Sequence, residues 1–265
     1  MREAHGVFAP KHDPIPLATL IANDTEHLGV VATMSTTFWP PWMLARMSST
    51  IDHIAGGRFG WNIVSSAEDR SAQNFGMDKM PEHDQRYEVA DEYLDLVTQL
   101  WDSWEPDAVV LDHESGTYAD GTKVHTIDFE GKYFKSRGPL NTARSPQGQP
   151  VFVQAGASPK GREFASKWAD SIIATATGVE AMKAYRDDVR ERMVAHGRKP
   201  DDCKVLFLVS PILGDTEAEA QAKYQQMISD PDYIQQILIS ISSISEIDFS
   251  QFDLCLLYTS DAADE

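Results

Sequence analysis

The chain has 265 residues, of which 42% are hydrophobic and 24% charged, and its formal net charge at pH 7 is −18. This composition is typical of a globular protein with a substantial core. The acidic balance argues against nucleic acid and anionic membrane as partners, because both need clustered lysine and arginine. Cys203 and Cys255 form neither a disulfide framework nor a metal-binding motif, which predicts a protein of the reducing cytoplasm. No apolar run approaches the roughly 18 residues of a membrane span.

Short apolar, β-branched runs recur along the chain and predict strands. They lie near residues 28–34, 58–64, 150–155, 170–175 and 204–210. The segments between them have helical periodicity, which is clearest from Tyr87 to Trp104. Further helices are predicted near residues 42–54, 159–168, 179–196, 215–228 and 231–240. This alternation predicts an α/β fold with a parallel sheet, either open or closed into a barrel.

Residues 105–149 interrupt the alternation of strand and helix. They are rich in glycine and contain short strand-like pieces, such as residues 123–129. We interpret them as an insertion between two βα units.

The segment 154–162 (QAGASPKGR) has the features of a phosphate site. Gly156 allows a backbone to approach a ligand closely, while Ser158 and Pro159 favour the start of a helix. The free N–H groups at that helix start, with Lys160 and Arg162 beside them, would attract an anion. An ordinary capped loop explains the same residues equally well.

Other polar residues are expected near this segment, because the carboxyl ends of parallel strands meet at one edge of a sheet. Thr33 and Asn62 lie toward the ends of the first two predicted strands. His83 and Tyr87 are four residues apart, so they share a face if the long helix begins that early. A lone histidine near a helix start is more often a cap or a solvated residue than a ligand contact. The sequence contains no dinucleotide fingerprint, P-loop or metal-binding motif, and it identifies no catalytic base.

Several motifs occur in order along the chain: 28–37 (LGVVATMSTT), 56–66 (GGRFGWNIVSS), 131–134 (GKYF) and 154–156 (QAG). They closely resemble the bacterial luciferase-like flavin monooxygenases, and in particular the nitrilotriacetate and dibenzothiophene-sulfone monooxygenase branch. The resemblance extends from about residue 13 to residue 254.

The resemblance implies a TIM (β/α)8-type barrel, of which this chain supplies about strands 3–7 as one incomplete domain over residues 1–254. It also implies a two-component, homo-oligomeric enzyme. A separate flavin reductase supplies reduced FMN, which reacts with O2 to give a flavin hydroperoxide that oxygenates a small organic substrate. By position, Thr33, His83, Tyr87 and Ser158 match the FMN-contacting residues of the family. Asn62 and Gly156 are weaker matches.

The chain departs from the family pattern at both ends. The match begins just before the third strand, and the family continues past the motif at 247–250 (IDFS). Residues 255–265 (CLLYTSDAADE) resemble a translated sequencing adapter, so we interpret them as a non-native tail. Two alternatives to an FMN-dependent monooxygenase remain: a non-catalytic flavin- or phosphate-binding barrel protein, and a deazaflavin-dependent oxidoreductase of the same superfamily.

Five strands of a barrel leave two open edges and uncovered apolar faces. We therefore expect the 265-residue chain by itself to be an inactive fragment that aggregates and binds FMN weakly. Light scattering, denaturant unfolding and FMN titration would check this expectation. A cooperatively unfolding monomer that binds FMN with micromolar affinity would contradict it.

Overall fold

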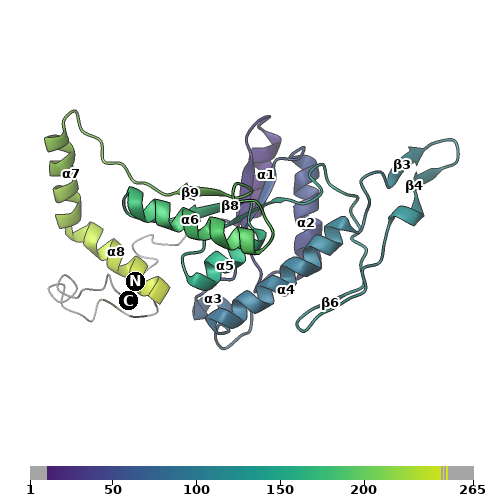
Figure 1. Cartoon of the computed structure of the whole chain (residues 1–265), viewed down its shortest axis with the longest axis horizontal. Coiled ribbons are helices and arrows are strands. Elements are labelled where there is room, and N and C mark those ends of the chain that lie inside the picture. Colours follow the sequence, from purple (N-terminus) through teal and green to yellow (C-terminus); the bar gives the residue numbers. More distant parts are fainter. Residues whose placement is uncertain (1–10, 246, 248, 250–265) are drawn as a thin grey trace. The chain divides into compact units, whose positions relative to one another are not determined.

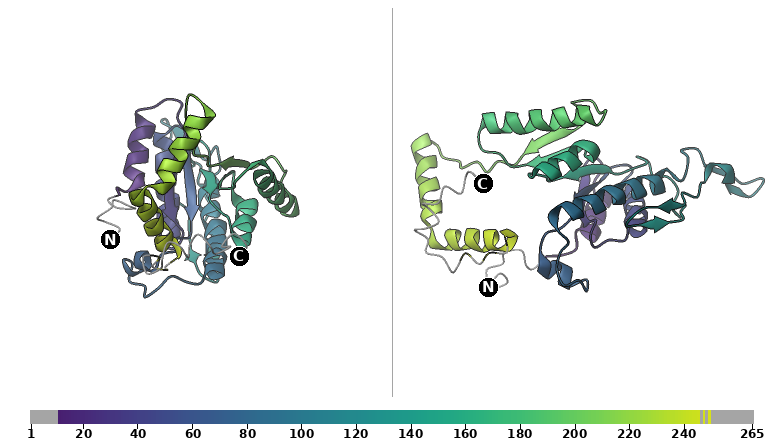
Figure 2. Two further views of the ribbon diagram at one scale, coloured as in Figure 1. Left: turned by 90° about the vertical axis from the view of Figure 1, so that its left-hand side faces the viewer. Right: turned by 60° about the horizontal axis from the view of Figure 1, so that its bottom comes forward.

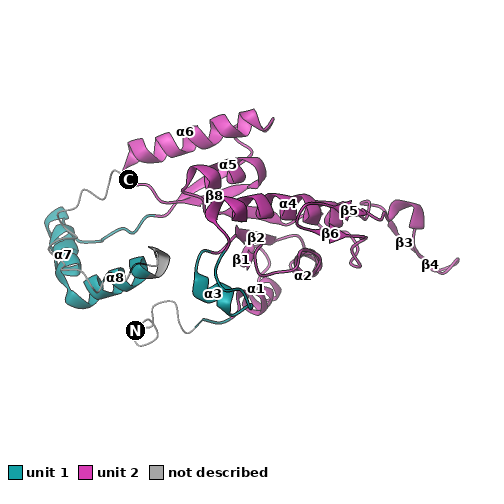
Figure 3. Cartoon of the chain, turned by 90° about the horizontal axis from the view of Figure 1, so that it is seen from below, with its two compact units in different colours: residues 1–12, 67–80, 209–265 teal, residues 13–66, 81–208 magenta. Residues whose placement is uncertain are grey.

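The computed structural model describes residues 11–245, 247 and 249, so the predicted tail at 255–265 lies outside the described residues. The chain divides into two compact units, shown in Figure 3. The larger consists of Asp13–Ser66 and Pro81–Leu208, and the smaller of Met1–His12, Ala67–Met80 and Val209–Glu265. Every residue predicted for the site belongs to the larger unit. The single domain expected over residues 1–254 stays a prediction.

A five-stranded parallel sheet forms the centre of the larger unit. Its strands are β1 (Val30–Ser35), β2 (Phe59–Val64), β7 (Val151–Gln154), β8 (Ser171–Ala174) and β9 (Lys204–Phe207), in the order β1-β2-β7-β8-β9. This confirms the predicted α/β fold with five parallel strands. The described sheet is open, with β1 and β9 at its edges. The last strand ends at Phe207, three residues earlier than predicted.

Five helices accompany this sheet, and they are labelled in Figure 1. They are α1 (Pro14–Asn23), α2 (Pro41–Ile54), α4 (His83–Asp102), α5 (Pro159–Trp168) and α6 (Val179–Ala195). The described part of the smaller unit contains α3 (Asp69–Gln73), α7 (Glu217–Ser229) and α8 (Pro231–Ser245). No helix within the described ranges is long and apolar enough to cross a membrane.

The sequence did not predict helices α1 and α3. Helix α1 has no polar face to give a periodic pattern, because Leu17, Leu20 and Ile21 are exposed while other apolar residues are buried. The helix depends instead on contacts at its two ends. Asp13 caps its N-terminus, and the Arg58 guanidinium donates to the carbonyl of Ala22 in its last turn and to that of Thr25 just after it. Helix α3 spans five residues, which is too short for a period to show.

The two faces of the sheet differ in burial. On one face, Trp61 is fully buried and its ring contacts Phe152 of β7 and residues of α4. On the opposite face, Val31 and Val151 flank Gly60 in register and are 50% and 39% exposed, and Leu206 of β9 is 57% exposed. The described core therefore lies between the sheet and its helices. Helices α5 and α6, which cover the β8 and β9 side, pack against each other (Figure 2).

The predicted insertion at 105–149 forms two small antiparallel pairs. Strands β3 (Val109–Asp112) and β4 (Thr117–Ala119) make a hairpin that extends away from the sheet of its own unit (Figure 1). Strands β5 (Phe129–Glu130) and β6 (Lys135–Ser136) make the second pair. Of the strand predicted at 123–129, only Val124, in an isolated bridge to Trp104, and Phe129 form strand pairs, because Gly121–Lys123 is a 3-10 turn and Asp128 has a left-handed backbone, with φ 45°.

Glu92 of α4 attaches the second pair to the body of the unit. Its carboxylate accepts main-chain N–H bonds from Lys132, Tyr133 and Phe134 at 2.9, 2.7 and 2.8 Å. Gly131 lies so close to this carboxylate that a Cβ atom at that position would clash with it. A single side chain thus satisfies three successive donors of the turn between β5 and β6.

We predict that Glu92→Ala lowers the free energy of unfolding by about 1–3 kcal/mol, because three donors lose a charged acceptor. Urea unfolding would measure the loss, and amide exchange at residues 132–134 should become faster. Glu130→Ala is the control, because its salt bridge to Lys135 is exposed and should contribute little. Unchanged exchange at residues 132–134 would contradict the anchoring role of Glu92.

Candidate functional site

The start of α4 meets the loop between β7 and α5. Helix α4 begins at His83, as the i, i+4 argument required, and the rings of His83 and Tyr87 are 5.1 Å apart between centroids. His83 Nε2 lies 3.3 Å from Ser158 Oγ, and this oxygen also accepts the Gly161 N–H at 3.0 Å as the N-cap of α5. Three of the residues predicted for the site are therefore brought together.

The tautomer of His83 follows from its second contact. Its Nδ1 lies 2.8 Å from an Asp84 carboxylate oxygen, which can only accept a hydrogen bond. Nδ1 therefore carries a proton, and in the neutral ring Nε2 accepts from the Ser158 hydroxyl. On protonation, Nε2 becomes a donor that can face an anion.

Tyr87 provides a donor at the same place. Burial raises the pKa of its hydroxyl, and hydrogen bonds with Ser158 and Gln154 oppose this shift only in part. The hydroxyl therefore keeps its proton at neutral pH. The Tyr87 ring rests on Phe164 of α5, with centroids 5.6 Å apart.

Two glycines allow these elements to approach closely. A Cβ on Gly156 would lie 2.6 Å from Gln154 Oε1 and 2.8 Å from main-chain atoms of Gly161. A Cβ on Gly161 would lie 2.7 Å from the Tyr87 hydroxyl. The end of β7, the first turn of α5 and the first turn of α4 can therefore meet only where side chains are absent.

A cavity of about 180 Å³ opens beside this junction, at the ends of β2 and β7. Ser65, Ser66, Tyr87 and Gln154 contribute polar atoms to its wall, and Phe164 is among its apolar residues. Gln154 is only 4% exposed and its Oε1 has no hydrogen-bond partner, so the cavity presents a buried acceptor that still needs a donor. In the sequence, Gln154 is marked only by its place in the motif 154–156 (QAG), which does not indicate a buried acceptor.

Thr33 and Asn62 form a separate pair on the exposed face of the sheet. Asn62 Nδ2 donates to Thr33 Oγ1 at 2.9 Å, and the two residues are partners in the β1–β2 register. Asn62 Oδ1 is buried without a partner. Within the described residues, no hydrogen bond or ring contact joins this pair to His83, Tyr87 and Ser158.

Other hydroxyls at the ends of β1 and β2 connect the strands to each other. Ser66 Oγ donates to Ser35 Oγ at 2.9 Å, and Thr37 Oγ1 donates to the Ser65 carbonyl at 2.7 Å. Ser66 has a left-handed backbone, with φ 59°. Many of the hydroxyl groups at these two strand ends therefore form hydrogen bonds between the strands.

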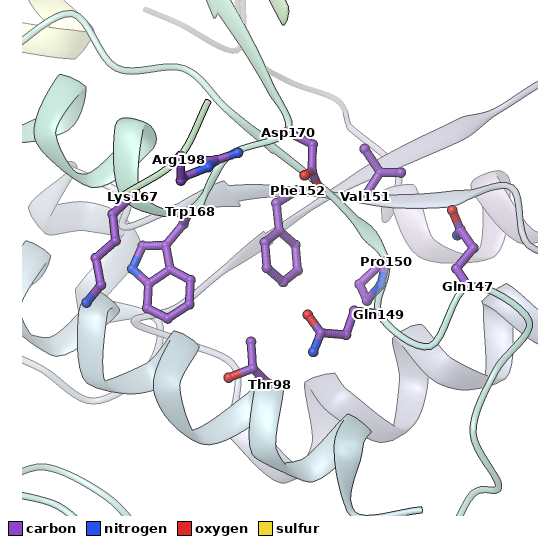
Figure 4. Close-up of a pocket in the computed structure, with 10 residues that line it drawn as sticks. All are labelled: Thr98, Gln147, Gln149, Pro150, Val151, Phe152, Lys167, Trp168, Asp170 and Arg198. Atoms are coloured by element: carbon purple, nitrogen blue, oxygen red, sulfur yellow. The ribbon is translucent and has the colours of Figure 1, made fainter. Parts of the chain in front are cut away.

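A larger cavity of about 490 Å³ lies at the opposite ends of β7 and β8 (Figure 4). Its charged and amide side chains already have partners within the fold. Lys167 pairs with Asp91, Gln149 donates to Asp102, and Arg198 donates to two main-chain carbonyls. With its donors committed in this way, it is the weaker candidate for a ligand site.

The model of the luciferase-like monooxygenase family matches residues 1–245. Dibenzothiophene-sulfone monooxygenase of Rhodococcus erythropolis is 45% identical over 217 residues, which are 82% of this chain and 48% of that protein. Nitrilotriacetate monooxygenase component A of Aminobacter aminovorans is 41% identical over 244 residues, 91% of this chain and 53% of that protein. The chain spans about half the length of the curated relatives it matches.

A solved structure shows the same relationship. The crystal structure of a riboflavin lyase with modified FMN and its substrate riboflavin superposes with a TM-score of 0.86 at 37% identity, covering 94% of this chain and 55% of that one. The five parallel strands correspond to part of the TIM-type barrel of such enzymes. The match along the sequence and the match in fold agree, and the chain belongs to the luciferase-like monooxygenase family of flavin-dependent oxidoreductases.

Proposed function

We propose that this chain carries the flavin-phosphate site of a monooxygenase that uses reduced FMN and O2 to oxygenate a small organic substrate. The observation that carries the proposal is the junction of Ser158, His83 and Tyr87 at the N-terminus of α5. A separate flavin reductase would supply the reduced FMN, since the nitrilotriacetate relative is named as one component of a system. The cytoplasmic location and the homo-oligomeric state belong to the same proposal.

The junction suits the phosphate of FMN in chemistry and in space. Ser158 and Tyr87 offer hydroxyls, and His83 offers a ring nitrogen that becomes a donor when it is protonated. Helix α5 is ten residues long and begins at the same place. Pro159 has no N–H and the Gly161 N–H is bonded to Ser158 Oγ, so exposed Lys160 contributes the free main-chain N–H of the first turn together with its ammonium group. The absence of side chains at Gly156 and Gly161 allows the elements that carry these donors to lie close together.

The pair on the sheet face suits the remainder of the cofactor. Thr33 offers a hydroxyl, and Asn62 Oδ1 is a buried acceptor without a partner. Flavin carries N–H and O–H donors that such an acceptor would bind. These two residues would therefore hold the ring or the ribityl chain.

When bound, reduced FMN supplies the electrons that activate O2. The residues of this chain bind and orient the cofactor, and we assign none of them as a general base. The two curated relatives described above are named for a sulfone and an aminopolycarboxylate. Because those substrates share little chemistry, we name no substrate for this chain.

The phosphate site predicts a preference for FMN over riboflavin, which lacks the phosphate. Fluorescence titration should give an FMN dissociation constant about tenfold or more below that of riboflavin, because charged hydrogen bonds contribute about 1.5–3 kcal/mol each. Ser158→Ala should reduce the preference. Equal binding of the two flavins would contradict the site, and tighter binding of a deazaflavin cofactor would favour the deazaflavin alternative.

Turnover separates a monooxygenase from a non-catalytic flavin-binding protein. The assay would contain the chain, FMN, a flavin reductase, NADH and 18O2. A sulfone, a dialkyl sulfide and an aminopolycarboxylate would be tried separately as substrates. One 18O atom in the product would establish oxygenation. Preferential FMN binding with no labelled product would agree both with the non-catalytic alternative and with the inactive fragment expected from the open sheet, whereas labelled product would contradict both.

The glycine junction predicts that Gly156→Ala weakens both the fold and FMN binding. A Cβ there meets Gln154 Oε1 and the Gly161 backbone, and overpacking of this kind costs about 1–3 kcal/mol. Gly121→Ala is the matched control, because nothing lies within 4 Å of its added Cβ and its φ is not positive. Thermal unfolding and FMN titration of both variants would test the prediction. Equal melting temperatures and equal FMN affinities of the two variants would show that Gln154 and Gly161 do not pack tightly against Gly156.

A further inference from the structure

The loop that carries Gly156 is held from outside the site by Tyr185 of α6. The Tyr185 hydroxyl donates to the Gly156 carbonyl oxygen at 2.5 Å. Ordinary loop packing does not require such a contact, because the loop is already attached to β7 and capped by Ser158. The hydrogen bond controls one specific peptide group, that between Gly156 and Ala157.

The direction of this peptide group decides where its N–H points. The peptide bond between Gly156 and Ala157 is trans, since the cis bond found among the described residues is Gly138-Pro139. In a trans peptide the carbonyl and the N–H of the next residue point in opposite directions. With the Gly156 carbonyl directed at Tyr185, the Ala157 N–H points away from that side chain. Ala157 is exposed, and its N–H donates to no acceptor within the described residues. This donor immediately precedes Ser158, the N-cap of α5.

Tyr185 is itself held in place before any ligand arrives. Its ring packs edge-on against Phe207 of β9 with centroids 6.0 Å apart, and the Arg162 guanidinium lies over it at 5.6 Å. Arg162 is fixed in turn by Asp188 of α6 at 2.7 Å. On the other side of the loop, Gly156 is confined by the close contacts described above. The peptide is therefore preorganised, and preorganised donors bind an anion without paying an ordering cost.

We propose that Tyr185 is a positioning residue of the phosphate site: its hydroxyl orients the Gly156–Ala157 peptide so that the Ala157 N–H joins the donors for a phosphate group. The proposal rests on the proposed function for the identity of the ligand. It assigns to α6 a role in anion binding although no residue of α6 touches the anion.

The test compares FMN and riboflavin binding in Tyr185→Phe, which keeps the ring and removes only the hydroxyl. We expect FMN to bind about 5- to 20-fold more weakly, because the Ala157 N–H is no longer held in position for its hydrogen bond to the charged phosphate, while riboflavin binding stays unchanged. Tyr93→Phe is the matched control, because the Tyr93 hydroxyl also donates to a main-chain carbonyl, that of Trp39 at 2.9 Å. The control should keep the ratio of the two affinities even if it is less stable.

A second variant removes the proposed donor itself. Ala157→Pro has no N–H at that position, so it should lower FMN affinity relative to riboflavin by a similar factor. Adding Tyr185→Phe to Ala157→Pro should then have no further effect. If Tyr185→Phe fails to fold, the single Ala157→Pro variant decides: an unchanged flavin ratio overturns the proposal, and a lowered ratio supports it.

Inorganic phosphate separates this proposal from the assignment of FMN. At constant ionic strength set with chloride, phosphate should raise the melting temperature of the wild type more than that of Tyr185→Phe. If the wild type prefers neither flavin but phosphate still shows this difference, the positioning role stands and the flavin assignment falls. If FMN is preferred and Tyr185→Phe keeps the wild-type ratio, or loses both flavins equally, the positioning role is wrong. If phosphate protects neither protein, or both to the same extent, the role is also wrong.

Discussion

The geometry of the candidate site depends on the buried indole of Trp61. Its ring contacts Tyr93 and Trp101 of α4 and Phe152 of β7, with centroid distances of 6.0, 6.4 and 6.0 Å, and its Nε1 donates to the Met34 carbonyl at 2.9 Å. Helix α4 carries one half of the phosphate junction, and β7 leads into the other half. One side chain of the sheet therefore fixes both halves relative to each other. Aromatic contacts suit this task because they combine large buried area with preferred geometry.

A second set of contacts, between α5 and α6, is made of ion pairs. Asp188 binds both Arg162 and Arg192, and Glu163 binds Arg192 at 2.8 Å. Hydrogen bonding to Arg192 lowers the pKa of Glu163, so its contribution to stability is present above the ordinary carboxyl pKa and is lost as the pH falls through the lowered value. These pairs are partly exposed and individually weak. Together they fix the position of α6 along α5, and this position brings Tyr185 to the loop.

The sequence predicts well those features that local chemistry determines. Helix α5 begins and ends at the residues that Ser158, Pro159 and the apolar spacing predict. The spacing of His83 and Tyr87 likewise predicts that they lie on one face of α4. Tyr185 could not be found in this way, because it follows Gly156 by almost thirty residues and nothing in its own helix marks it. The same holds for the interruption of the predicted strand 123–129, where the left-handed backbone of Asp128 is not apparent from the sequence.

The proposed cofactor site has two parts that different elements support. The phosphate part is held from the helix side of the sheet by α4, α5 and α6, through contacts that lie within one compact unit. The part made by Thr33 and Asn62 lies on the opposite, exposed face, beside apolar residues such as Val31. Recognition of the phosphate is therefore physically separable from recognition of the ring. Whatever covers the exposed face can change how the ring is bound, while the donors at α5 keep the geometry that their own helices impose.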